Sequence, residues 1–296
     1  MLVVVVVTFL VCWFLGSRVE VPAGLLASAD RYVIAVALPA VIIATMSKVD
    51  IDPATVLPVA VAWVSMAVCA GVVSVLGRVM RWSRETVGAL LLVAVLGNTS
   101  FLGIGVVRAL LGDDHVAAAI SYDQLGTFLA LATYGSWVAG RFGTGDHGAR
   151  SVVRRLLRFP PFLALVASVG LRSIDIPDGV IDVLSATGRT VAPVAMGVLG
   201  LRFRLRIARG AVSPALWGLA VKMLCVPVLV ACVALASGGR HDVAWAASVM
   251  QSAAPPMVTA GVVAVTAGLD EEVVSFMVGV GTLLAFVSLP LVGLAF

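Results

Sequence analysis

The chain has 296 residues, of which 61% are hydrophobic and only 12% are charged, whereas a soluble domain is about half apolar and about a quarter charged. Together with a mean hydropathy of +1.10, this composition excludes an ordinary water-soluble protein. The formal net charge of +4 does not indicate a nucleic-acid partner, because the basic residues lie in joints between apolar segments.

Apolar runs separated by short polar joints predict membrane-spanning helices. A hydrocarbon core of about 30 Å takes about 20 helical residues to cross, whereas spanning strands are about 10 residues long and alternate in polarity, which excludes a barrel. The first run lacks the basic start and cleavage site of a secretory signal, so we interpret it as a retained helix. We expect an all-α membrane protein with ten transmembrane helices at residues 1–16, 31–47, 54–77, 84–112, 115–140, 159–171, 178–201, 211–236, 242–268 and 271–295.

Basic residues are concentrated in alternate joints of this arrangement. One set of joints holds Arg18, Arg31, Arg78, Arg81, Arg84, Arg141, Arg150, Arg154, Arg155, Arg158, Arg202, Arg204, Arg206 and Arg209. The other set holds only Lys48, Arg172, Arg189 and Arg240. Because cytoplasmic joints carry the excess of Lys and Arg, we expect a multi-pass protein of the cell membrane with both termini outside.

The two halves of the chain show an internal repeat. A basic cytoplasmic linker, residues 141–158, separates a first half, 1–140, from a second, 159–296. An offset of 156 residues aligns Pro58 with Pro214, Cys69 with Cys225 and Gly112 with Gly268. Five spans is an odd number, so the second half would enter the membrane from the opposite side, giving two inverted five-helix repeats as in many secondary transporters. Chance similarity between two apolar halves is the alternative.

The fourth and ninth spans are equivalent under this offset, and both contain helix-breaking residues near their centres. Glycine and small polar residues cluster at 96–103, and two consecutive prolines interrupt 251–256. Two broken helices that cross would bring free N–H groups suited to an anion, and carbonyls suited to a cation, to one place. The alternative is a pair of kinked helices packed by small residues. Our candidate substrate-binding residues are Gly97, Asn98, Thr99, Ser100, Gln251, Pro255, Pro256 and Thr259.

Two ionisable residues lie deep within predicted spans. Asp123 is roughly 12 Å from the outer end of the fifth span, and Lys222 is about 13 Å from the same face in the eighth. A charge at the bilayer centre costs about 2.5–3.5 kcal/mol, so each residue should have a partner. We expect them, with the neighbouring Gln124, to form an ion-coupling site in which the two groups form or alternate in an ion pair and Asp123 takes up a proton. The alternative is a fixed pair that holds the fifth and eighth helices together.

Cysteine and histidine spacing indicates no metal site. The four cysteines, Cys12, Cys69, Cys225 and Cys232, lie in apolar runs without a CxxC pair, and no HExxH motif occurs. We therefore expect neither a disulfide framework nor a metal centre.

The sequence resembles the auxin efflux carrier family, whose bacterial members include malate and malonate permeases. The resemblance covers essentially the whole chain and rests on LGNTSFLGIG (96–105), YDQLGTFLA (122–130), VAPVAMGVLGLRF (191–203) and QSAAPPMVTAGVVA (251–264). It implies that helices 4 and 9 cross at a central substrate site. It also implies a scaffold of helices 1, 2, 6 and 7 that forms a homodimer, a transport core of helices 3–5 and 8–10, carboxylate substrates and no cofactor. Thr259 stands where many members have asparagine, and the first crossing segment lacks their proline.

We therefore expect a secondary active transporter, not an enzyme, that moves a small organic anion across the plasma membrane by alternating access, with proton coupling or driven by the membrane potential. One alternative is a sodium-coupled symporter of the bile-acid transporter type, which would need acidic and amide side chains clustered at the crossing. We identify Gln251 there but no Glu or Asp beside it. A membrane enzyme would need a catalytic constellation at depth, where Asp123 is the only carboxylate we identify. A non-transporting membrane sensor is the third alternative.

Overall fold

A computed structural model describes residues 2–19, 21–46, 56–144, 157–158, 160–171, 174, 176–202, 209–239 and 242–294. Throughout these ranges the regular structure is helical, with no β-strand. Helices long and apolar enough to cross a membrane span Gly24–Ala44, Val56–Val79, Gly210–Ala236 and Glu271–Gly293, and shorter apolar helices span Val7–Arg18 and Pro160–Leu171. The all-α membrane class predicted from composition is thus confirmed.

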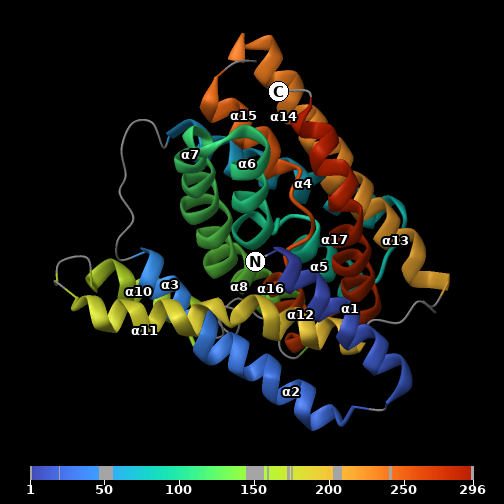
Figure 1. Ribbon diagram of the computed structural model, residues 1–296. Helices are drawn as coiled ribbons and strands as arrows, with labels where there is room; N and C mark the ends of the chain where they lie inside the picture. The colour runs from blue at the N-terminus through green and yellow to red at the C-terminus, as the bar shows by residue number, and fades with distance from the viewer. Residues whose placement is uncertain are drawn as a thin grey trace.

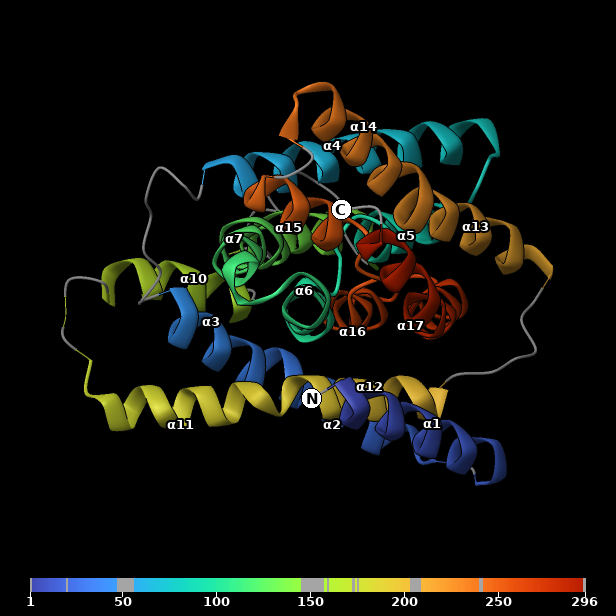
Figure 2. The same ribbon diagram turned by 45° about the horizontal axis from the view of Figure 1, so that its top comes forward.

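One group of helices lies along one side of the molecule in both views (Figures 1 and 2). Its members from the first half are α1 (Leu2–Arg18), α2 (Ala23–Tyr32), the π-helical turn η1 (Val33–Ala37) and α3 (Leu38–Met46). Its members from the second half are α10 (Pro160–Leu171), α11 (Asp178–Arg189) and α12 (Val191–Arg202). We call this group the lower layer.

The remaining helices form a second group against the lower layer (Figure 2). From the first half these are α4 (Val56–Val79), α5 (Arg84–Val93), η3 (Thr99–Gly103), α6 (Ile104–Leu111), η4 (Asp113–His115), α7 (Val116–Ser121), η5 (Tyr122–Phe128), η6 (Leu131–Gly135) and α8 (Ser136–Phe142). From the second half they are α13 (Arg209–Ala220), η7 (Val221–Cys225), α14 (Val226–Ala236), α15 (Val243–Ser252), α16 (Val258–Thr266) and α17 (Glu271–Gly293).

Two predicted spans have different limits in the structure. The helix predicted at 31–47 begins at Ala23, because Pro22, with φ −56°, precedes the first turn and the polar residues that follow remain helical. Asp30 therefore lies within a helix and is buried. The helix predicted at 178–201 is interrupted at Thr190, whose N–H and hydroxyl both bond to the Thr187 carbonyl.

Some predicted joint residues cannot be compared with the structure. Lys48, Arg150, Arg154, Arg155, Arg172, Arg204, Arg206 and Arg240 lie outside the described residues.

Small residues allow the lower-layer helices to approach closely. A Cβ atom added to Gly16 of α1 would lie 2.6 Å from the Leu201 carbonyl oxygen of α12, and one added to Gly200 would lie 2.5 Å from the Phe9 carbonyl oxygen. Close backbone approach at glycine is the usual means by which helices associate where no hydrophobic effect drives them together.

Hydrogen bonds gather several helix ends at one end of the second group. Ser83 caps α5 by accepting from the Thr86 N–H at 3.1 Å. The Thr86 hydroxyl donates to Asp270 at 2.6 Å, and Asp270 caps α17. The Thr144 N–H, just after α8, donates to the Ala267 carbonyl after α16 at 2.9 Å. These ends belong to joints that the charge distribution predicts to be cytoplasmic.

Candidate functional site: the crossing of two interrupted helices

Both helices that the sequence predicts to be broken are interrupted. α5 ends at Val93 and helical structure resumes at Thr99, while α15 ends at Ser252 and α16 begins at Val258. The second interruption contains Pro255 and Pro256, which have no N–H to continue a helix. The first has no proline, and Asn98 leaves helical geometry with φ −80° and ψ 63°.

The two interruptions pair with each other, and we call this place the crossing. The Asn98 N–H donates to the Pro255 carbonyl at 2.7 Å, and the Met257 N–H donates to the Leu96 carbonyl at 2.9 Å. Gly97 and Pro256 lie opposite each other in this antiparallel bridge. Irregular backbone within a membrane must find its hydrogen bonds inside the protein. Each interruption therefore supplies partners that the other has lost.

Several buried polar atoms at or next to the crossing have no hydrogen-bond partner among the described residues. They are the Asn98 amide nitrogen and oxygen, the Thr259 hydroxyl, the Gln251 Oε1 and the Gln124 Oε1. Asn98 and Thr259 are each only 1% exposed. Since buried polar groups are normally hydrogen-bonded, these atoms are available to a ligand. Gln251 is anchored by its other amide atom, because Nε2 donates to the Ala119 carbonyl at 2.9 Å.

Asp123 lies beside the crossing and is completely buried. Its Oδ1 accepts hydrogen bonds from the hydroxyls of Thr99 and Ser100, each at 2.6 Å. Its Oδ2 accepts from Gln124 Nε2 at 3.0 Å. The Asp123 carboxylate thus lies next to Thr99 and Ser100, two of the candidate substrate-binding residues. Depth along a helix gives a residue's level in the membrane but not these neighbours.

Lys222 also reaches the crossing. It belongs to η7, is 4% exposed and donates from Nζ to the Ser252 carbonyl at 3.2 Å. Asp123 and Lys222 thus hydrogen-bond to different partners in this conformation. That the two groups form or alternate in an ion pair stays a prediction.

The structure adds two residues that sequence reasoning did not assign to the site. The Tyr122 and Ser65 hydroxyls lie 3.2 Å apart, and both residues are buried. They line a cavity of about 10 Å³ together with Met66, Cys69, Val95, Gly97, Thr99, Thr127, Lys222 and Val226. This is close to the smallest volume that holds one water molecule. Ser65, a polar residue within the apolar run of α4, is the sequence feature that could have indicated this part of the site.

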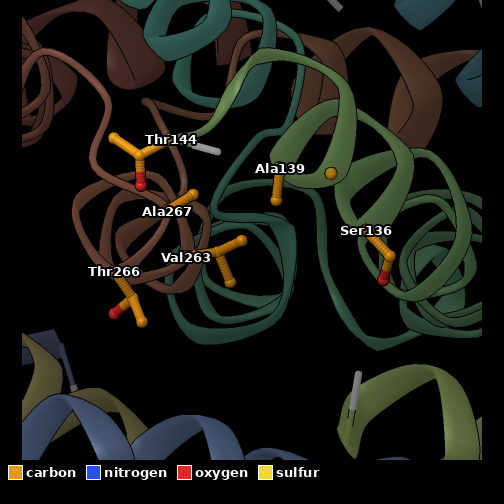
Figure 3. A pocket seen from close by; sticks show the side chains of 7 residues that line it. Ser136, Ala139, Thr144, Val263, Thr266 and Ala267 are labelled. Carbon is orange, nitrogen blue, oxygen red and sulfur yellow. The ribbon is translucent and has the colours of Figure 1, made fainter. Parts of the chain in front are cut away.

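A larger pocket lies away from the crossing, between α8 and the C-terminal end of α16 (Figure 3). Its volume is about 240 Å³, and it is lined by Ser136, Ala139, Gly140, Thr144, Val263, Thr266 and Ala267. None of the candidate site residues is among them. The pocket lies at the end of the molecule where Thr144 bonds to Ala267.

The described ranges contain no group of three or more His, Cys, Asp or Glu side chains that could hold a metal ion.

Comparison with known proteins adds a family match. Residues 1–143 and 147–292 match the model of a family described as "Membrane transport protein". The chain is 28% identical, over 295 residues, to an uncharacterized transporter of Methanothermobacter thermautotrophicus, covering 97% of this chain and 95% of that protein. It is 30% identical over 182 residues to an uncharacterized transporter of Methanocaldococcus jannaschii, covering 58% of each chain.

Proposed function

Because this chain belongs to the membrane transport protein family, the auxin efflux carrier family that its sequence resembles, we propose that it is a secondary transporter that binds a small organic anion at the crossing. The observation on which this proposal depends is the pairing of two interrupted helices beside buried polar atoms without partners. A continuous pair of helices would need neither feature.

The proposed architecture is ten transmembrane helices in two inverted repeats. Glycines with positive φ recur near helix ends at an offset of 156 residues. Gly112, with φ +98°, ends α6, and Gly268, with φ +73°, follows α16 at the same offset. The packing of α1 on α12 corresponds to the packing of α10 on α3, with the halves exchanged. These correspondences support a common ancestor of the two halves and are not expected from chance similarity of apolar sequence.

The chemistry of the crossing favours an anionic solute. α16 begins there without a side-chain cap, so its first backbone N–H groups are directed toward the interruption between α15 and α16. Asn98 can donate from its amide, and the Thr259 hydroxyl can donate as well. Carboxylates are the class of anion that the family resemblance implies.

Transport would proceed by alternating access in the cell membrane, with both termini outside. The lower layer corresponds to the scaffold, which is formed by the first, second, sixth and seventh predicted spans (residues 1–16, 31–47, 159–171 and 178–201). We propose that the protein forms a homodimer through this scaffold. The other group corresponds to the moving core, which is formed by the third to fifth and the eighth to tenth predicted spans. The pocket between α8 and α16 would then face the cytoplasm.

We assign coupling to Asp123, Gln124 and Lys222, with a proton or the membrane potential as the driving force. A sodium-coupled symporter is the second candidate, because Asp123 lies at the crossing and offers the carboxylate such a protein needs.

The test is solute uptake by the purified protein in proteoliposomes, using a panel of mono- and dicarboxylates that includes malate and malonate. Asn98→Ala should lower uptake at least about tenfold if its amide contributes roughly 1.5–3 kcal/mol of charge-assisted hydrogen bonding to the anion. Ser74→Ala is the matched control, because that hydroxyl bonds only within its own helix, to the Ala70 carbonyl. Equal uptake by both variants would contradict a solute site at the crossing.

A further inference from the structure

The carbonyl group of Ser252 is left without a backbone donor by the sequence that follows it. In a continuous α-helix the carbonyls of residues 251 and 252 accept from the N–H groups of residues 255 and 256. Both of those residues are proline, which has no N–H. The Gln251 carbonyl instead accepts from the Ala254 N–H at 3.2 Å. The Ser252 carbonyl accepts from Lys222 Nζ, also at 3.2 Å.

Lys222 therefore supplies the donor that Pro256 lacks, and it does so with a positive charge. The C-terminal end of a helix carries partial negative charge on its carbonyls, so a cation is favourable there. In broken transport helices these same carbonyls commonly coordinate the coupling ion. The Lys222 ammonium lies beside the Ser252 carbonyl at the end of α15, where such an ion would bind.

The surroundings fix the ammonium group between the two interrupted helices. A Cβ atom added to Gly97 would lie 2.9 Å from Lys222 Nζ, so the ammonium lies directly against the first interruption. On another side it lines the 10 Å³ cavity with the hydroxyl residues Ser65, Thr99 and Tyr122. Of the described residues that line this cavity, only Lys222 carries a charge. Asp123, which accepts a hydrogen bond from the Thr99 hydroxyl, is not among the lining residues.

We propose that the Lys222 ammonium is the resident cation of the crossing. It occupies the place beside the Ser252 carbonyl that a coupling metal ion would otherwise take, so transport does not require sodium. This inference rests on the transport function proposed above, because it specifies how that site is coupled. It also separates the two coupling candidates, since a sodium symporter needs an open cation position where the lysine lies.

The first arm of the test uses the wild-type protein. Its melting temperature in detergent and its uptake rate in proteoliposomes should be the same in sodium chloride and in choline chloride. A melting temperature or an uptake rate that is higher in sodium chloride than in choline chloride overturns the proposal. This arm uses only the wild type, so it does not depend on the folding of a variant.

The second arm uses methylammonium chloride as a soluble replacement for the lysine amine. Lys222→Ala should melt below the wild type, and methylammonium should raise its melting temperature by a few degrees, because a ligand of the folded state stabilises it by mass action. Lys222→Met, which fills the space without a charge, and the wild type should not respond. A folded Lys222→Ala protein that is indifferent to methylammonium overturns the proposal.

These melting measurements do not depend on transport. If methylammonium stabilises Lys222→Ala but no solute is taken up by the wild type, the proposed transport function fails while the resident cation stands. If uptake occurs but requires sodium, the transport function stands and the resident cation fails.

Discussion

Gly97 shows how a single residue without a side chain shapes the crossing. It lies opposite Pro256 in the backbone bridge and directly against the end of the Lys222 side chain. The space that a larger residue would occupy is filled by the ammonium group, so glycine at this position serves close approach rather than an unusual backbone angle.

We expect Gly97→Ala to displace the Lys222 ammonium from the Ser252 carbonyl. Because the displaced atom is the end of a flexible side chain, the protein should still fold, with a stability loss of about 1.5–3 kcal/mol for a lost charged hydrogen bond. The uptake rate of the folded variant should also fall clearly below that of the wild type. Gly105→Ala is the matched control, because a Cβ there would meet nothing within 4 Å. Similar melting temperatures and uptake for the two variants would contradict the assigned contact.

Asp123 can be tested for its charge with little change in shape. In Asp123→Asn the amide oxygen can still accept from Thr99 and Ser100. The Gln124 amide, whose Nε2 donates to Asp123 in the wild type, can turn over so that its Oε1 accepts from the new NH₂ group. The variant should therefore fold. Wild-type uptake should rise with an imposed inward proton gradient, and uptake by Asp123→Asn should not respond to it.

The exposed Asp114 provides the control for that measurement. Asp114→Asn should respond to the proton gradient as the wild type does. A response by Asp123→Asn of wild-type size would show that its carboxylate is not the coupling group.

At the scale of elements, the interruptions and the close helix contacts depend on each other. The two breaks share hydrogen bonds between segments more than 150 residues apart in sequence. Neither break could exist alone in a membrane, because its unpaired backbone groups would each cost several kcal/mol. The helices around them hold the breaks in register.

The contact between α1 and α12 is one such support, and it leaves no room for a side chain at Gly200. We expect Gly200→Val to separate these helices and to lower stability by about 1–3 kcal/mol, because the Phe9 carbonyl oxygen and the Trp13 nitrogen opposite it belong to the backbone and cannot move aside. Gly170→Val on α10, where a Cβ meets nothing within 4 Å, should leave the melting temperature nearly unchanged. Equal melting temperatures for the two variants would refute the close contact.

At the scale of the whole molecule, the orientation in the membrane is the property to test. The ends of α8 and α16 meet at one end of the second group, and Arg84 there donates to the Arg141 carbonyl. The distribution of basic residues predicts that this end faces the cytoplasm.

Single cysteines in a background without Cys12, Cys69, Cys225 and Cys232 can test this assignment. A membrane-impermeant thiol reagent should label Thr144→Cys only in inside-out vesicles and Asp114→Cys only in right-side-out vesicles. Both residues are exposed, so both variants should be labelled in detergent. The reverse pattern would invert the proposed topology.

The sequence by itself determined the membrane class, most helix limits and the positions of both breaks, because these follow from local properties. Hydropathy sets where a helix can cross a bilayer, two prolines remove N–H groups wherever they occur, and Gly97-Asn98 favours irregular backbone. The sequence also predicts a common depth for Asp123 and Lys222, because depth is expected from counting residues along a helix.

Only the tertiary structure decided what those residues meet. Counting along a helix gives height but neither the direction a side chain points nor the helix that lies beside it. Thus Asp123 bonds to Thr99 and Ser100, and Lys222 bonds to the carbonyl that Pro256 cannot satisfy. Such contacts join helices far apart in the chain, and packing of the entire bundle fixes them.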